Sequence, residues 1–426
     1  MEKPKGRILV VGQHYWPETF RSTDLCEGLV ERGYEVDVLT GIPNYPGGKF
    51  FEGYSVRKNR KQQKGGVNIE RAFEIPRGSK SNFRIFLNFA SYSIAQLFHL
   101  PKYLRRKYDR IICYQLSPVT MTLMPIILSK LTKTKLYMYI CDFWPHSLFS
   151  IINIKSKFWR KFFTKFSYWH YRQGDAASGV FEGIAERLVS EVGFAPENVA
   201  YIPQVAEKLY EKEVYDAELE ARFKDGKFNI VFAGNINPAQ AFDVVTKAAR
   251  EVKDRGADNI RYIILGEGMS KQWLTDEVKR LDMEEDWVFE GLKPVEDVPK
   301  YQTIADSLLV ALSKSELFTY GIPAKVQSYM AAGKPIIASM DGDAKRLVNE
   351  SGSGKCADAG DYMRLADIIW EMATSPKEEL KKYGNAAKAY HFAHFERNAN
   401  LDKYIDFLFK DDKELINKEI VNTNNS

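Results

Sequence analysis

The sequence predicts an α/β protein of two doubly wound domains, and two observations carry this prediction. The length of 426 residues suits two or three domains. A strand–helix–strand pattern starts near Arg7 and starts again near Asn229. Hydrophobic residues make up 45% of the chain and charged residues 27%, which is ordinary for a water-soluble globular protein.

The first pattern begins with a short apolar strand over 7–12, which ends in glycine. Residues 20–32 follow with apolar side chains at helical spacing, and Gly33 is a plausible helix stop. Residues 34–40 form the next predicted strand. Further strands of this half are expected at 110–114, 136–140, 178–181 and 200–202.

The second pattern begins with a strand over 229–234, again ending in glycine. Helices are expected at 242–255 and 271–281, and strands at 260–266, 287–291, 305–312 and 335–339. The predicted organisation is a Rossmann-like domain over 1–207, a charged linker over 208–226, a second Rossmann-like domain over 227–395, and a C-terminal helix and polar tail over 396–426. Doubly wound domains bind ligands at the carboxyl ends of their strands, so we expect the two to face one another across an interdomain cleft.

Charge is distributed unevenly along the chain. The net charge is +5, but residues 51–172 carry 23 Lys and Arg against 5 Asp and Glu. Such an excess favours an acidic partner, namely anionic lipid, a phosphorylated acceptor or nucleic acid. The four cysteines show no paired spacing, so we expect reduced thiols in a cytoplasmic protein and no metal site. No apolar run is long enough to cross a bilayer, and the nearest, 85–100, is interrupted by polar residues.

Two loops of the first domain follow predicted strands. The segment 12–18 does not match the GxGxxG fingerprint, so a nicotinamide cofactor is disfavoured. The alternative is that this segment is an ordinary loop between a strand and a helix. Asp142 comes directly after the strand at 136–140, at a ligand-binding strand end. Its alternative role is to cap the following turn.

The most informative stretch is 316–335. Pro323 suits the first turn of a helix that runs to Ala332, with Gly333 as its C-terminal cap. The backbone of Tyr320, Gly321 and Ile322 would then present N–H groups at a positive helix end, which suits a diphosphate. Lys325 adds charge there, and Gln327 and Ser328 are placed to reach ribose hydroxyls. A plain amphipathic helix with a good cap remains the alternative.

Six motifs in order give a family resemblance over roughly residues 7–408. They are the loop with Pro17 and Glu18, then 40–47, 142–145, 232–235, 265–268 and 323–335. Together they resemble glycosyltransferase family 4, and within it the bacterial surface-polysaccharide branch that includes N-acetylfucosamine transferases. The resemblance implies two facing Rossmann-like domains of the GT-B architecture, retention of anomeric configuration, a nucleotide-sugar donor and no required metal or other cofactor.

The resemblance also implies roles for residues. Donor binding falls to Asn235, Gln240, Gly266, Gly291, Leu292, the 320–322 loop, Lys325, Gln327 and Ser328. Acceptor binding falls to Pro17, Glu18 and Arg21. Asp142 and Lys325 are the implied catalytic residues. The chain departs from the family pattern in two ways. Tyr320 and Ser328 stand at the two positions where the family usually has glutamates. Asn235 and Gln240 stand at the positions where the family usually has basic residues that meet the diphosphate.

The expected function is transfer of a sugar, such as an N-acetylated deoxyhexosamine, from a UDP-sugar to a polyprenyl-diphosphate-linked glycan during O-antigen or capsule synthesis. The alternatives are a nucleotide-sugar epimerase of the same architecture and a non-catalytic basic binding protein. An epimerase does not explain the basic half. A nucleic-acid binder leaves the phosphate-type loop without a role.

A membrane-facing helix is expected at 155–172, where Lys and Arg alternate with large aromatic residues. Its expected lipid contacts are Lys157, Trp159, Arg160, Lys161 and Phe163. This places the protein on the inner face of the cell membrane as a peripheral protein. The alternative is that the aromatic rings are core residues and the cations a solvated face.

Overall fold

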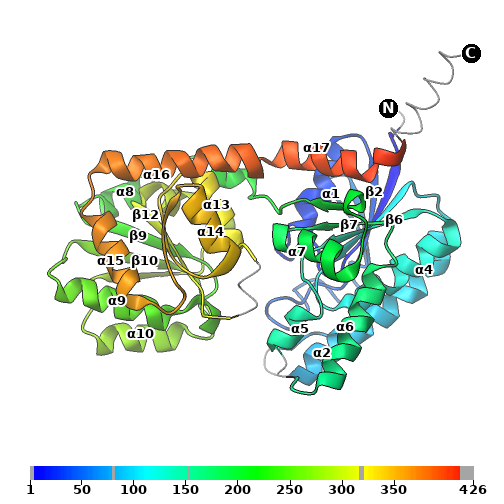
Figure 1. Cartoon of the computed structure of the whole chain (residues 1–426), viewed down its shortest axis with the longest axis horizontal. Helices are drawn as coiled ribbons and strands as arrows, with labels where there is room; N and C mark the ends of the chain where they lie inside the picture. The colour runs from blue at the N-terminus through cyan, green and yellow to red at the C-terminus, as the bar shows by residue number, and fades with distance from the viewer. Residues whose placement is uncertain (1–3, 79–81, 152–153, 316–320, 413–426) are drawn as a thin grey trace, which may run out of the picture. The chain divides into compact units, whose positions relative to one another are not determined.

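The computed structural model describes residues 4–78, 82–151, 154–315 and 321–412. It divides into two compact units (Figure 1). Unit 1 comprises residues 1–203 and 398–426, and unit 2 comprises 204–397. Each unit is built on a mainly parallel sheet with helices, which confirms the predicted α/β class of two doubly wound domains.

In the described part of unit 1 the sheet has the strand order β3-β4-β2-β1-β5-β6-β7-β8. All neighbours are parallel except β3 and β4, which are antiparallel. The strands are β1 (Arg7–Val11), β2 (Glu35–Thr40), β3 (Lys61–Lys64), β4 (Val67–Arg71), β5 (Arg110–Gln115), β6 (Lys135–Ile140), β7 (Ala176–Gly179) and β8 (Val199–Tyr201).

Helices surround this sheet. They are α1 (Ser22–Glu31), α2 (Asn82–Ala95), α3 (Leu100–Leu104), α4 (Leu123–Thr132), α5 (His146–Ile151), α6 (Lys157–Tyr171), α7 (Glu182–Arg187) and α17 (Arg397–Leu408). The last of these returns from the end of the chain, and its Leu401, Tyr404 and Leu408 are buried in the core of unit 1. The expected C-terminal helix is therefore a structural part of the N-terminal unit.

Unit 2 holds a parallel sheet whose order in the described residues is β11-β10-β9-β12-β13-β14. Its strands are β9 (Phe228–Ala233), β10 (Ile260–Leu265), β11 (Trp287–Gly291), β12 (Ser307–Ala311), β13 (Ile336–Ser339) and β14 (Gly354–Ala357). Its helices are α8 (Ala217–Phe223), α9 (Phe242–Asp254), α10 (Lys271–Arg280), α11 (Val298–Ile304), α13 (Ala324–Ala332), α14 (Gly342–Glu350), α15 (Tyr362–Ala373) and α16 (Lys377–Tyr390).

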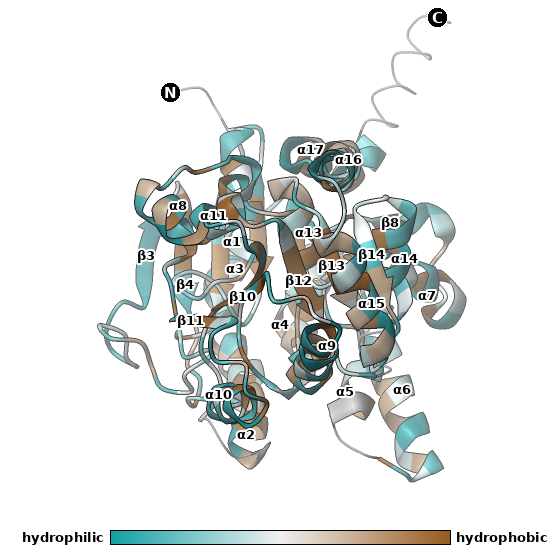
Figure 2. Cartoon of the chain, turned by 90° about the vertical axis from the view of Figure 1, so that its left-hand side faces the viewer, coloured by the Kyte–Doolittle hydropathy of each residue, from teal (hydrophilic) through white to brown (hydrophobic). Residues whose placement is uncertain are grey.

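The cores follow from the apolar runs. In β1, Ile8 to Val11 are at most 1% exposed, because helices cover both faces of a parallel strand. Figure 2 shows the same contrast in unit 2, where β10, β12 and β13 are brown and the outer helices carry teal residues. The chain turns after α1 at Gly33, whose φ of +89° favours glycine. Gly33 therefore ends the helix, as the sequence predicted.

The structure adds elements that the sequence pattern did not indicate. β3 has the sequence Lys-Gln-Gln-Lys, and β4 alternates buried and half-buried residues, so neither forms the continuous apolar run of a central strand. The charged segment 208–226, expected as a linker, contains α8 and lies within unit 2. Of the helices in the described residues, none combines the length and the apolar character needed to cross a membrane.

Candidate functional site

Three loops meet at the carboxyl ends of β9, β10 and β11 in unit 2. The Gly234 amide donates to the Leu265 carbonyl at 2.9 Å, and the Gly266 amide donates to the Gly291 carbonyl at 2.7 Å. A Cβ atom added to Gly266 would lie 1.9 Å from the Gly234 oxygen, and the φ of Gly266 is +139°. Only glycine allows so close an approach, so these loops form a compact backbone surface at the strand ends.

Lys325 lies over this surface, in the first turn of α13. Its Nζ is 3.9 Å from the centre of the Phe232 ring and donates to Oε1 of Gln240. A Cβ on Gly234 would lie 2.5 Å from Cε of Lys325, so the glycine leaves the space that the lysine occupies. Burial lowers the pKa of Lys325 to about 7. An anion at this point would favour the charged ammonium and restore the pKa.

The helix that carries Lys325 ends as predicted, and it begins at Ala324, one residue later than predicted. Pro323 is the N-cap residue of α13, its carbonyl accepts from the Val326 amide at 2.9 Å, and Gly333 caps the C-terminus with φ +66°. The first amides of the helix therefore stand beside Lys325, where an anion is favoured by the helix dipole.

The other predicted donor residues differ in accessibility. Asn235 is exposed, Leu292 is 77% exposed, and Gly321 and Ile322 are half-buried, with Ile322 packed against the core of unit 2. Gln327 is only 1% exposed. The Ser328 hydroxyl donates to the Ala324 carbonyl of its own helix at 3.1 Å. Tyr320 lies outside the described residues. The accessible predicted residues thus gather at the strand ends and at the start of α13, whereas Gln327 and Ser328 face inward.

In unit 1, Glu18 holds two loops together. Its Oε1 accepts from the amides of Asn44 and Tyr45 at 2.6 and 2.7 Å, and its Oε2 pairs with Nδ1 of His14 at 2.8 Å. Glu18 is 4% exposed. Its carboxylate therefore fixes the backbone around the acceptor-side loops and is itself largely covered.

Glu74 is a second buried carboxyl group that the sequence did not single out. Side-chain amides donate to it from Gln13 at 2.7 Å, from Asn44 at 2.7 Å and from Asn88 at 3.1 Å. All four side chains are at most 1% exposed, and burial raises the pKa of Glu74 well above its ordinary value. We call Gln13, Asn44, Glu74 and Asn88 the amide cluster. It joins loops at the ends of β1, β2 and β4 to helix α2.

The other predicted acceptor residues lie at the same turn. Pro17 is half-buried, and half-buried Arg21 is the N-cap residue of α1. Both therefore stand close in sequence to Glu18 at the carboxyl end of β1.

Asp142 lies at the carboxyl end of β6, as predicted. The hydroxyls of Ser117 and Ser147 each donate to one of its carboxylate oxygens, and the Trp144 indole donates to Ser117 Oγ at 2.8 Å. Burial raises the pKa of Asp142, while the two hydroxyls oppose this shift. The residue keeps partial exposure. A carboxylate with a raised pKa, held by two hydroxyls on a partly exposed residue, is suited to accept a proton from a substrate hydroxyl or to orient it.

The basic aromatic segment forms α6. Lys157, Arg160 and Lys161 are exposed, and Phe163 is half-buried. The rings of Phe158, Trp159, Phe162 and Trp169 are 47–70% exposed. These four rings are therefore not core residues, contrary to the alternative interpretation of this helix.

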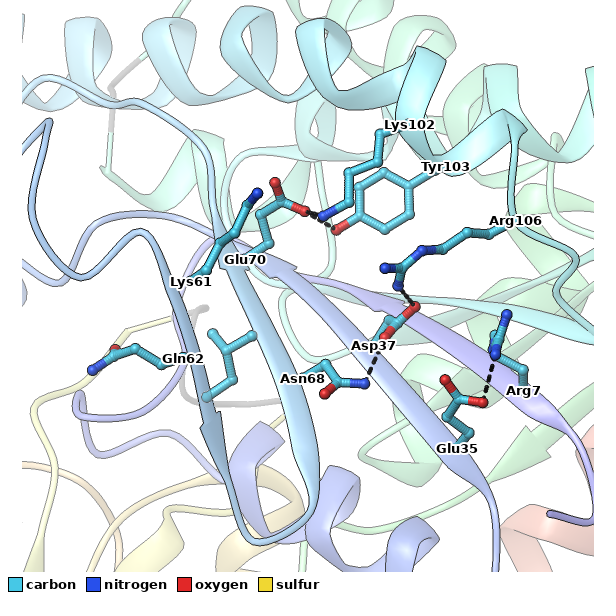
Figure 3. Close-up of a pocket in the computed structure, with 11 residues that line it drawn as sticks. Arg7, Glu35, Asp37, Lys61, Gln62, Asn68, Glu70, Lys102, Tyr103 and Arg106 are labelled. Atoms are coloured by element: carbon cyan, nitrogen blue, oxygen red, sulfur yellow. Dashed lines mark hydrogen bonds and ion pairs between the residues drawn. The ribbon is translucent and has the colours of Figure 1, made fainter. Parts of the chain in front are cut away.

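A pocket of about 510 Å³ lies on unit 1 near the amino ends of β1 and β2 (Figure 3). Arg7 pairs with Glu35 at 2.6 Å, Arg106 with Asp37 at 2.5 Å, and Lys102 with Glu70. None of the predicted residues is among those lining it. Its lining extends from the amino ends of β1 and β2 to Glu70 near the carboxyl end of β4, and it includes neither Glu18 nor Asp142. Among the described residues, no three His, Cys, Asp or Glu side chains gather as metal ligands.

Comparison with known families assigns both halves of the chain. Residues 216–390 match the model of glycosyl transferases group 1, and residues 20–204 match that of the glycosyl transferase 4-like domain. The chain is a glycosyltransferase. The order of the two matched domains agrees with the two doubly wound units described above.

Relatives of this glycosyltransferase include an enzyme named for colanic acid biosynthesis. The putative colanic acid biosynthesis glycosyl transferase WcaI of Escherichia coli is 25% identical over 344 residues, covering 77% of this chain and 81% of the relative. The probable glycosyltransferase WbjE of Pseudomonas aeruginosa is 27% identical over 51% of this chain and 54% of its own.

Solved structures share the fold. Anabaena HepE in complex with UDP and glucose has a TM-score of 0.68 at 13% identity, covering 95% of this chain and all of that one. Sucrose-phosphate synthase from Thermosynechococcus elongatus has a TM-score of 0.71 at 14% identity, covering 98% of this chain and all of its own.

Proposed function

We propose that this glycosyltransferase moves a sugar from a UDP-sugar to a lipid-linked glycan with retention of configuration, in the synthesis of a surface polysaccharide. The polysaccharide assignment is supported by the names of WcaI and of the amylovoran biosynthesis glycosyltransferase AmsK of Erwinia amylovora. The donor sugar that the family resemblance favours is an N-acetylated deoxyhexosamine. The reaction is proposed to need no metal or other cofactor.

One observation carries the donor half of this proposal, namely the position of Lys325. Its ammonium stands beside the first amides of α13 and above the glycine contacts of Gly234 and Gly266. A diphosphate held there would meet a positive side chain, the positive end of a helix dipole and a backbone surface without side chains. The binding of UDP by HepE, a structure of the same fold, supports a uridine nucleotide.

The acceptor half rests on unit 1. Asp142 is proposed to orient or deprotonate the acceptor hydroxyl while Lys325 and α13 stabilise the departing diphosphate. The loops fixed by Glu18 and the amide cluster are proposed to shape the acceptor site. The basic segment 51–172 and the exposed rings of α6 support an acceptor carried by an anionic membrane, on its inner face.

A nucleotide-binding experiment tests the donor assignment. Thermal unfolding is followed with UDP, GDP and ADP, for the wild type, Lys325→Met and the exposed-surface control Lys382→Met. UDP at 100 times its dissociation constant adds about 2.7 kcal/mol of stability. We expect stabilisation of the wild type and the control, and a much smaller effect on Lys325→Met. Equal stabilisation of all three would remove Lys325 from the donor site.

A donor-only assay separates the transferase from an epimerase. An epimerase converts a UDP-sugar without any acceptor, whereas a transferase at most hydrolyses it slowly. Accumulation of an isomeric UDP-sugar in the absence of acceptor would contradict the proposed function.

A further inference from the structure

Helix α2 has two opposite faces. Asn88 and Tyr92 are fully buried, whereas Phe83, Phe86 and Ile94 are 66, 63 and 59% exposed. The spacing of these three residues places them on one side of a helix. Phe98, in the turn that follows α2, is 80% exposed. A row of large apolar side chains is thus left uncovered along the outer face of the helix, which is unusual for a surface in contact with water alone.

The charge of the surrounding chain indicates what covers this face. Residues 75–108 contain seven Lys and Arg and no Asp or Glu, and two of the seven, Lys102 and Arg106, pair with Glu70 and Asp37. The segment 143–174, which includes α6, contains six and again none. Both helices lie toward the same end of unit 1 in the two views (Figures 1 and 2). A second copy of the chain would place like charges against each other, whereas an anionic bilayer offers phosphates to the cations and an apolar interior to the rings.

The inner face of α2 contacts the acceptor-side loops. Asn88 donates to Glu74 and to the Ile75 carbonyl at 2.7 Å, and it accepts from Gln13 at 2.9 Å. The Arg77 guanidinium lies 5.4 Å from the Phe89 ring of α2 and 5.5 Å from the Tyr45 ring. The helix therefore connects its exposed face directly to the amide cluster and to the loop that Glu18 holds.

We propose that the outer face of α2, made by Phe83, Phe86 and Ile94, inserts into an anionic bilayer together with Phe98 of the following turn. It acts as a second contact beside α6 and holds the acceptor-side loops at the lipid surface. This inference rests on the proposed function, because a lipid-linked acceptor is what such loops would meet there. It assigns the contact to a helix that lacks the alternation of basic and aromatic residues seen in α6.

The experiment measures binding to vesicles of phosphatidylglycerol mixed with phosphatidylcholine, and to vesicles of phosphatidylcholine alone. The proteins are the wild type, Phe83→Ser/Phe86→Ser, and Leu131→Ser as a matched control. Leu131 is 61% exposed on α4 of the same unit. Removing two exposed rings should weaken binding to the mixed vesicles about tenfold or more, while the control binds like the wild type.

Further measurements keep the result interpretable. If the double variant is poorly folded, Phe98→Ser provides the test, because it changes a single residue outside the helix. It should also weaken binding to the mixed vesicles. UDP-induced thermal stabilisation should be unchanged in all variants. If both Phe variants bound the vesicles as tightly as the wild type, the proposal would be overturned. If these variants also differed from the wild type in sedimentation mass, the face would be assigned to self-association. Absence of UDP stabilisation in the wild type would instead contradict the proposed function and leave this contact standing.

Discussion

The Nζ atom of Lys325 lies 3.9 Å from the centre of the Phe232 ring, so the donor-side ammonium rests on an aromatic face. An aromatic face attracts a cation without neutralising it. Burial then lowers the pKa of this lysine to about 7. The charge needed to hold a diphosphate is therefore only partly present in the free protein at neutral pH.

This arrangement predicts proton uptake when UDP binds. At about pH 8, Lys325 is mostly neutral, and a bound diphosphate favours its protonated form, so close to one proton should enter with the nucleotide. The phosphate itself titrates near pH 6 and stays constant above pH 7. Calorimetry in buffers of different ionisation enthalpy measures the uptake. UDP affinity should fall up to about tenfold per pH unit above 7.

Two variants control that measurement. Lys325→Met should bind UDP weakly and take up no proton, and Lys382→Met should behave like the wild type. A wild-type affinity that stays constant from pH 7 to pH 9, without proton uptake, would show that Lys325 does not meet the diphosphate.

The glycine contact between Gly266 and Gly234 predicts a large loss of stability on substitution. In Gly266→Ala the new Cβ would lie 1.9 Å from a backbone oxygen, in addition to the strain of a positive φ. Gly256→Ala is the matched control, because its φ is +90° and nothing lies within 4 Å of the added atom. Denaturant unfolding should show a cost of about 1–2 kcal/mol for the control and about 3 kcal/mol more for Gly266→Ala. Similar losses would mean that the loops separate easily.

Local patterns were sufficient to predict the strands and helices that line the donor side. Apolar runs ending in glycine placed β9 and β10 within a residue of their bounds, and a Pro–Gly pair bounded α13. Lys325 and Gln240 are 85 residues apart in sequence, and the structure brings them into contact. Only the family resemblance could pair them beforehand.

Other features depend on packing between distant segments. Glu74 resembles an ordinary polar strand residue, and only the approach of Gln13, Asn44 and Asn88 makes its complete burial tolerable. The return of α17 to unit 1 depends on Tyr404 meeting Tyr139, more than 260 residues away in sequence, with ring centres 5.3 Å apart. No local pattern of hydrophobic residues contains such a partner.

The cations of α6 predict salt-sensitive membrane binding. Replacing Lys157, Lys161 and Lys165 by Gln removes three charges worth about 1 kcal/mol each near an anionic surface, so binding to phosphatidylglycerol vesicles at low salt should weaken about 100-fold. The control replaces Lys377, Lys381 and Lys382 of α16, which are exposed on unit 2. The difference between the two variants should shrink as salt is added. Equal binding to neutral vesicles at every salt concentration would contradict an electrostatic contact.

Asp142→Asn tests the acceptor half of the reaction. The amide cannot take a proton, so turnover should fall about 10²- to 10⁴-fold while UDP affinity stays unchanged. Asp175→Asn is the control, because Asp175 accepts from the Leu136 amide at the other end of the same strand. Its variant should lose stability but keep turnover per folded molecule. Unchanged turnover in Asp142→Asn would remove this residue from the mechanism.

The pH profile adds a test that a purely structural role would not meet. Burial raises the pKa of Asp142, so kcat/KM should fall as the pH drops through a value above the ordinary aspartate pKa, where the base becomes protonated. The Ser117 hydroxyl donates to the ionised carboxylate and therefore lowers this pKa. Ser117→Ala should consequently shift the acidic limb to higher pH. Since Trp144 donates to the same hydroxyl, Trp144→Phe should shift the limb in the same direction but by less. If the acidic limb stayed in place in both variants, the group that titrates in the pH profile would not be Asp142.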